Sequence, residues 1–148
     1  MKIWFADTSA LVKRYVREQG SDWLRNDVVK QEVLISQITP IELTAALGRK
    51  FRQGHISKFA FYQARRMFFL HLEAQQYSVI DLDQSIVDIA LRLTFKQGLR
   101  AYDAVQLATA LECRKNIDPN RFIFLTSDKE LEIISKAEGL QTDNPLNH

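Results

Sequence analysis

The sequence contains little of what marks a secreted, membrane-spanning or thiolate-metal protein. Its one cysteine, Cys113, excludes an intramolecular disulfide, and no histidine motif lies near it, which favours a packing role. No apolar run approaches the roughly 20 residues that a spanning helix requires. The short apolar run at the N-terminus does not match a secretory signal either. We therefore expect a protein that works in the cytoplasm and not in a membrane.

Glycine and proline are scarce as well, with 5 and 3 residues, which leaves little room for flexible linkers. No low-complexity tract or fixed-period repeat is present. The chain has 148 residues, of which 46% are hydrophobic and 26% charged, and this profile is typical of one globular domain, here residues 1–148. The three histidines, His55, His71 and His148, are far apart and match no zinc-binding spacing.

The net charge does not indicate a class of ligand, because the 20 lysines and arginines nearly balance the 18 acidic residues. If four of the acids bind cations, 20 basic residues remain against 14 acidic ones. Such a protein would present a mildly basic surface, which suits an anionic substrate. The same basic residues are equally typical of solvated helix faces.

Apolar runs alternate with segments of helical periodicity along the chain. The runs predict strands over 3–6, 33–36, 77–82 and 121–125. The periodic segments predict helices over 8–17, 22–30, 39–53, 57–75, 83–96, 102–114 and 128–137. Only the strand over 77–82 alternates between polar and apolar residues, which places it nearer an edge. The pattern indicates an α/β fold with a mostly parallel central sheet that is covered on both faces.

Four acidic residues stand where strands end or helices begin. Asp7 directly follows the first strand, and Asp128 comes just after the fourth. Glu42 lies in the first turn of the helix after the second strand, and Asp103 opens the helix that precedes the fourth. Ligands of such folds bind at the carboxyl ends of the strands. In a parallel sheet the first three acids share that edge, and Asp103 joins them if its helix starts there.

Each acid also has a purely structural explanation, because carboxylates are favoured at helix N-termini. Asp7 could cap its helix, and Glu42 could close a capping box with Thr39. Asp128 could lie in the first turn behind Ser127. Asp103 could support the start of the helix that follows Arg100 in the same way.

Taken together, however, four converging carboxylates repel one another unless a positive charge lies between them. A cluster of hard oxygen ligands suits Mg²⁺ or Mn²⁺. Such ions can orient a water, lower its pKa and stabilise charge on a phosphodiester. This chemistry needs neither a side-chain nucleophile nor a 2′-hydroxyl, so it does not choose RNA over DNA. The residues thus favour a metal-dependent nuclease.

Four segments in this order resemble the PIN domain and, more narrowly, the VapC-type toxins of bacterial toxin–antitoxin pairs. They are the segments 6–11, 38–43, 102–108 and 125–128. Asp-Thr-Ser alone is common, but the four together at these separations are specific, and the match covers about residues 1–145. The resemblance implies a three-layer α/β/α fold and a ribonuclease that depends on Mg²⁺ or Mn²⁺.

Carried over by position, the four acids match the acidic quartet of the family, as metal ligands and catalytic groups. Ser9 and Thr126 match hydroxyl positions that support the acids by hydrogen bonds. No acidic position departs from the family pattern, which predicts a competent site. The resemblance also implies a homodimer, an RNA substrate and a cognate antitoxin that covers the site.

Two further sets of residues could serve RNA or protein partners. A set of basic residues could line a path for RNA phosphates, or could simply be exposed helix surface: Arg14, Arg17, Arg49, Lys50 and Arg52. The helix over 57–75 is crowded with aromatic and leucine side chains, which indicates either core packing or a groove for a dimer or an antitoxin.

Two other functions remain open on the sequence alone. A PIN-like domain could act mainly as a binding module within an antitoxin–DNA complex. An acidic-pocket phosphatase or phosphoacceptor receiver is the other alternative. Such a phosphatase would carry a second Asp where Ser9 stands, and a receiver would carry a Lys after a late strand, whereas Lys129 directly follows Asp128.

Overall fold

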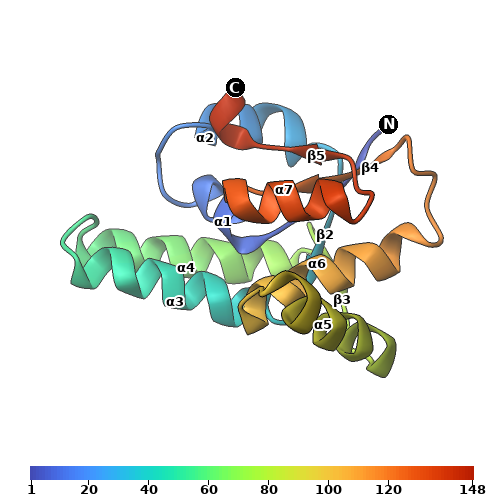
Figure 1. The fold of residues 1–148 in the computed structure, drawn as a ribbon. Helices are drawn as coiled ribbons and strands as arrows, with labels where there is room; N and C mark the ends of the chain where they lie inside the picture. The colour runs from blue at the N-terminus through green and yellow to red at the C-terminus, as the bar shows by residue number, and fades with distance from the viewer.

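The computed structural model describes residues 1–148, and a parallel sheet lies at its centre (Figure 1). The strands are β1 (Ile3–Ala6), β2 (Glu32–Ser36), β3 (Ser78–Ile80), β4 (Phe122–Leu125) and β5 (Thr142–Asp143). Their order in the sheet is β3-β2-β1-β4-β5, and every pair is parallel. This confirms the predicted α/β fold. The alternating strand, β3, lies at an edge as predicted.

Both faces of the sheet are buried, which explains why the central strands read as unbroken apolar runs. In β1, Trp4 and Ala6 belong to one hydrophobic cluster, whereas Ile3 and Phe5 belong to the other. Helices on the first face are α1 (Thr8–Leu11), α3 (Thr39–Arg52) and α4 (Lys58–Glu73). Helices on the second face are α5 (Gln84–Gln97), α6 (Ala101–Arg114) and α7 (Lys129–Ala137). The result is the three-layer α/β/α arrangement.

The helices α3 and α4 pack side by side and project beyond one end of the sheet (Figure 1). On the other face, α5 and α6 pack closely against each other. None of these helices has both the length and the apolar character that crossing a membrane would require.

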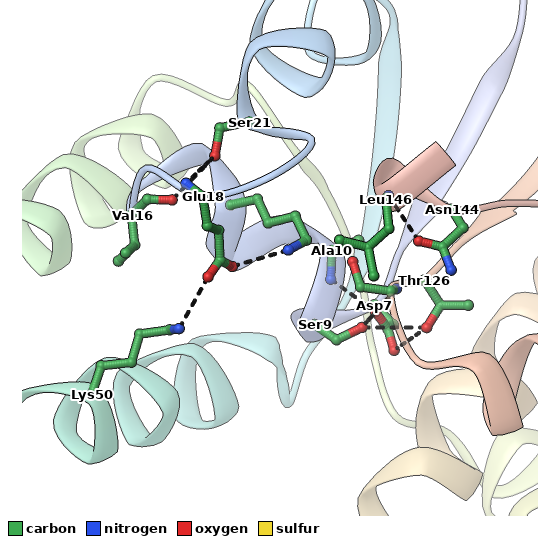
Figure 2. Close-up of polar contacts among 12 residues, drawn as sticks. Asp7, Ser9, Ala10, Val16, Glu18, Ser21, Lys50, Thr126, Asn144 and Leu146 are labelled. Atoms are coloured by element: carbon green, nitrogen blue, oxygen red, sulfur yellow. Dashed lines mark hydrogen bonds and ion pairs between the residues drawn. The ribbon is translucent and has the colours of Figure 1, made fainter. Parts of the chain in front are cut away.

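The first two helical segments are shorter than predicted. The predicted helix over 8–17 is α1 followed by the 3-10 turn η1 (Val12–Arg14), and the one over 22–30 is α2 (Ser21–Trp23) continued by the π-helical turn η2 (Leu24–Val28). Between them, the hydroxyl of Ser21 accepts a hydrogen bond from the Glu18 amide and donates one to the Val16 carbonyl (Figure 2). These bonds satisfy backbone groups that a continuous helix would have paired, and so stabilise a loop.

The same loop is fixed to α3 by a small charge network. Glu18 accepts hydrogen bonds from the ammonium groups of Lys13, at 3.1 Å, and Lys50, at 3.2 Å (Figure 2). Burial raises the pKa of Glu18, but its bonds to the two lysines outweigh that effect and hold the pKa below its usual value. Lys13 is itself buried, so this pairing compensates a charge that would otherwise be costly to bury.

The sequence did not reveal β5 or the turn that follows it, η3 (Pro145–Asn147). The strand has two partly exposed residues and no apolar run, so it gives no periodic signal. After it, the side chain of Asn144 accepts a hydrogen bond from the Leu146 amide, and Gln19 donates one to the Leu146 carbonyl. The ring of His148 stacks on Trp23 with centroids 3.8 Å apart. The C-terminal residues are therefore packed against α2.

This packing leads to a prediction about two glycines that both have positive φ. A Cβ at Gly20 (φ +88°) would overlap the Pro145 carbonyl, whereas one at Gly54 (φ +76°) would meet nothing within 4 Å. We expect Gly54→Ala to cost about 1 kcal/mol of unfolding free energy, because of backbone strain alone. Gly20→Ala should cost about 1–3 kcal/mol more, because η3 must move as well. Urea unfolding measures both, and equal losses would contradict the close seating of the C-terminal turn.

Candidate functional site

The four acidic residues singled out from the sequence line one cavity of about 190 Å³ at the carboxyl edge of the sheet. Asp7 follows β1 and Asp128 follows β4, which are neighbouring parallel strands. Glu42 reaches the cavity from the first turn of α3, after β2. Asp103 reaches it from the first turn of α6, which begins at this edge because it precedes β4. The fold therefore gathers residues that are up to 121 positions apart.

Asp7 is the most deeply buried of the four, with 3% of its surface exposed. One of its oxygens, Oδ1, accepts hydrogen bonds from the Ser9 hydroxyl, at 2.7 Å, and the Ala10 amide, at 3.2 Å. The other oxygen, Oδ2, accepts one from the Thr126 hydroxyl, at 3.0 Å (Figure 2). Asp7 thus caps α1, as its structural explanation required, and also faces the cavity. The two roles are compatible because the carboxylate has several lone pairs.

The hydroxyls of Ser9 and Thr126 connect the ends of β1 and β4. Ser9 Oγ accepts a hydrogen bond from the Ser127 amide, and Thr126 Oγ1 accepts one from the Asp128 amide. The two hydroxyl oxygens lie 3.3 Å apart. This arrangement fixes the position of Asp7 relative to the loop that carries Asp128.

Burial makes the charged form of Asp7 costly. Loss of hydration raises the pKa of Asp7 to about 7, and the nearby Glu42 charge adds to the rise, against the lowering effect of three hydrogen bonds. Burial likewise raises the pKa of Glu42, with a further contribution from Asp103. Burial and the neighbouring acidic charges thus favour the neutral forms of these carboxylates unless a cation lies beside them.

Glu42 is held by a residue that sequence reasoning did not identify. Its Oε1 accepts hydrogen bonds from Gln106, at 2.6 Å, and from the Thr8 hydroxyl, at 3.2 Å. The same Gln106 nitrogen also lies within hydrogen-bonding distance of the Thr39 and Thr8 hydroxyls. Gln106 is almost fully buried, and its own Oε1 has no partner. A glutamine between a valine and a leucine, in a helix rich in alanine and leucine, was the available signal.

The capping box predicted for Thr39 and Glu42 is wrong. The helix α3 begins at Thr39, so Ile38 is its N-cap and makes no side-chain capping bond. Thr39 instead points into the protein, where it is fully buried and meets Gln106. Because Glu42 is not used for capping, its carboxylate faces the cavity.

Asp103 and Asp128 are partly exposed, as Glu42 is, whereas Asp7 is buried. Asp128 is the N-cap of α7, and its Oδ1 accepts a hydrogen bond from the Leu131 amide at 3.1 Å. The structural explanation had placed Asp128 in the first turn, behind Ser127. That placement is wrong, because Asp128 itself is the N-cap. Burial raises the pKa of Asp103, and the Asp128 charge raises it further. These two carboxylates therefore repel each other.

The donor set of the cavity fits a divalent cation with a preference for oxygen. It consists of carboxylates and hydroxyls, with the unpartnered oxygen of Gln106 behind them, and Mg²⁺ and Mn²⁺ favour such ligands. No three acidic, histidine or cysteine side chains converge closely enough to hold an ion as they stand.

Of the five basic residues singled out from the sequence, Arg49 lines this cavity. The others have different surroundings. Arg14 donates hydrogen bonds to Tyr77 and Gln76 and lines a separate cavity beside α4. Arg17 pairs with Asp22, and Lys50 with Glu18. Arg52 is exposed at the end of α3.

The fold resembles several solved structures. A protein of Pyrobaculum aerophilum, PAE2754, has a TM-score of 0.66 at 20% identity, covering 95% of this chain and 89% of that one. A toxin–antitoxin complex from Klebsiella pneumoniae gives 0.66 at 18%, covering 97% and 98%. VapBC2 from Rickettsia felis, bound to a promoter DNA fragment, gives 0.64 at 15%, covering 96% and 98%. At these identities the likeness establishes the shared fold.

The sequence itself was compared with curated proteins and with protein families. No curated protein matches it. The family model of the PIN domain, in contrast, matches residues 4–137. That range includes most of β1, all of β4 and the four acids of the cavity, and it confirms the resemblance inferred from the sequence motifs. The chain belongs to the PIN-domain family.

Proposed function

We propose that the protein is an Mg²⁺- or Mn²⁺-dependent endoribonuclease and the toxin of a type II toxin–antitoxin pair, acting through one domain of residues 1–148. PIN-domain toxins are generally nucleases, and several solved structures with this fold are toxin–antitoxin complexes. The observation that carries the proposal is the cavity in which Asp7, Glu42, Asp103 and Asp128 face one another. It is too acidic to bind a phosphodiester without a cation.

Each acid has a distinct part in this proposal. Asp7 and Glu42 are held rigidly by neighbouring donors, so they are preorganised cation ligands. Asp103 and Asp128 are partly exposed and would complete the ligand set from the starts of α6 and α7. A bound Mg²⁺ or Mn²⁺ would lower the pKa of a water and stabilise charge that develops on the phosphodiester. Ser9 and Thr126 position Asp7 and do not need to touch substrate.

Arg49 is the chain's own positive charge at the cavity. A guanidinium binds phosphate oxygens in a two-pronged geometry. We assign Arg49 to a phosphate of the RNA strand. We also propose that the other four basic candidates belong to a wider path for RNA phosphates outside the cavity. Their side chains bind other residues or lie away from the cavity.

A cognate antitoxin and a second copy of the chain are the proposed protein partners. The helix α4 supports this part of the proposal, because only Ala64 and Phe68 of it are buried. Large apolar side chains remain exposed along it: Phe59, Tyr62, Met67, Phe69 and Leu70. An exposed apolar surface of this kind is typical of a protein–protein interface. The predicted core-packing role therefore applies to a minority of the aromatic residues.

The nuclease proposal is tested by incubating antitoxin-free protein with total RNA, with Mg²⁺, with Mn²⁺ and with EDTA. We expect discrete cleavage that requires the metal. Asp103→Asn should lower the rate at least about 100-fold, because it removes a proposed metal ligand. Asp27→Asn, an exposed acid far from the cavity, serves as the matched control and should cleave normally.

Cleavage that persists in EDTA, or in Asp103→Asn, would contradict the proposed mechanism. The alternative, a binding module that acts through an antitoxin–DNA complex, predicts that Asp103→Asn keeps its toxicity in cells. An aspartyl phosphate detected by mass spectrometry after incubation with a phosphate donor would instead support a phosphatase or receiver.

The raised pKa of Asp7 gives a second prediction, on the metal-free protein. Between its ordinary value of 3.8 and about 7, the folded state binds the Asp7 proton while the unfolded state releases it. Stability should therefore fall as pH rises from 4 to 7 and level off above 7. A shift of this size corresponds to at most about 4 kcal/mol.

Urea unfolding of wild type and Asp7→Asn from pH 4 to 8 measures this effect. The variant should become progressively more stable than wild type as pH rises, because an amide carries no charge to bury. Mg²⁺ at pH 8 should stabilise wild type more than the variant, because binding to the folded state adds to its stability. A constant difference between the two proteins at every pH would contradict the burial cost.

A further inference from the structure

A second hollow adjoins the acidic cavity. It has a volume of about 110 Å³ and is lined by Ile41, Glu42, Ala45, Arg49 and Tyr102. It shares Glu42 and Arg49 with the acidic cavity. Its walls come from α3, between Ile41 and Arg49, and from the first turn of α6, the helices that carry Glu42 and Asp103. The two hollows are therefore contiguous on the side of Arg49 and Glu42.

Tyr102 is the unusual member of this hollow. The hydroxyls of Tyr15 and Tyr77 bond to each other, and the ring of Tyr62 packs on Phe61. Tyr102 has no such partner among the aromatic pairs of the protein, and 56% of its surface is exposed. Across the hollow, Ile41 is 64% exposed. Tyr102 and Ile41 thus expose apolar surface to solvent in the same hollow as the Arg49 guanidinium. Tyr102 also directly precedes Asp103 in the sequence.

This combination has the chemistry of a nucleotide subsite. Proteins recognise RNA sequence mainly in unpaired segments, whose bases stack on aromatic side chains. Stacking of one base on an aromatic ring contributes about 1–3 kcal/mol and tolerates any base. An adjacent arginine can bind the phosphate of the same strand. A base within a duplex is already stacked and paired, so it could not occupy the hollow.

We propose that Tyr102 and Arg49 form a subsite for one unpaired nucleotide next to the scissile phosphate, with the base stacked on Tyr102 and a phosphate bound by Arg49. This inference rests on the proposed ribonuclease function and assigns two residues to one nucleotide of its substrate. Recognition by stacking selects unpaired structure and leaves base preference weak at this position.

The test uses the full chain and a mixed-sequence single-stranded oligoribonucleotide with 2-aminopurine at a central position, alone and annealed to its complement. Ca²⁺ replaces Mg²⁺, so that the acidic cavity can hold a cation. We expect the fluorescence of 2-aminopurine to fall when wild type binds, and binding by anisotropy to be tighter for the single strand than for the duplex. Tyr102→Ala should weaken single-strand binding about 5- to 100-fold, as loss of one stacked base implies, and abolish the quenching.

Two variants make the result specific. Tyr102→Phe keeps the ring and should bind within about 2-fold of wild type, because stacking needs no hydroxyl. Phe95→Ala removes an exposed aromatic ring of α5 that lines neither cavity and lies outside the α4 surface, and should bind as wild type does. Equal single-strand binding by wild type and Tyr102→Ala would overturn the subsite. So would a Tyr102→Ala protein that binds RNA normally but loses dimerisation, since the residue would then serve a protein interface.

The cleavage assay separates this inference from the function on which it rests. If wild type cleaves RNA and Tyr102→Ala cleaves it with unchanged kcat and KM, the subsite is wrong and the nuclease stands. If wild type shows ring-dependent quenching but never cleaves, the nuclease is wrong and the subsite is supported as an RNA-binding site.

Discussion

A carboxylate buried at the end of the central strand is the constraint on which the site depends. Asp7 is 3% exposed and lies beside other acids, so its charged form is costly unless a cation compensates it. The fold does not avoid this cost. It fixes the carboxylate in place with hydroxyls from Ser9 and Thr126, and thereby ties β1 to the loop after β4. The Asp128 amide is held by the same threonine, so two of the four acids are positioned through one set of contacts.

Sheet topology supplies the rest of the arrangement. Parallel pairing of β2, β1 and β4 brings their carboxyl ends to one edge, and the helices that start there carry Glu42, Asp103 and Asp128 in or directly before their first turns. Helix starts and strand ends are both found at this edge because parallel strands end there and the connections to the next strands begin there. The hollow beside Tyr102 follows from the same geometry, since α3 and α6 begin next to each other.

The sequence was sufficient to predict the strands of the central sheet, because burial on both faces leaves unbroken apolar runs. It also predicted that the four acids lie together, because those runs show where strands end and helices begin. It did not show features that depend on contacts between distant residues. Gln106 meets Glu42 across 64 positions, and β5 is too short to give a pattern. The capping box at Thr39 failed because a buried contact with Gln106 took the place of the local bond. Surface arginines could not be ranked from sequence, because Arg49 differs from Arg14 only in its surroundings.

The central claim is that the buried charge of Asp7 is compensated by a divalent cation, and proton release on metal binding tests it most directly. Calorimetric titration of Mn²⁺ at pH 6 and pH 8, each in two buffers of different ionisation enthalpy, counts the protons released. With a pKa of about 7 for Asp7, binding should release close to one proton at pH 6 and far less at pH 8. Asp7→Asn should bind Mn²⁺ weakly and without this difference. Equally tight binding by the variant, or no binding by wild type, would contradict the account.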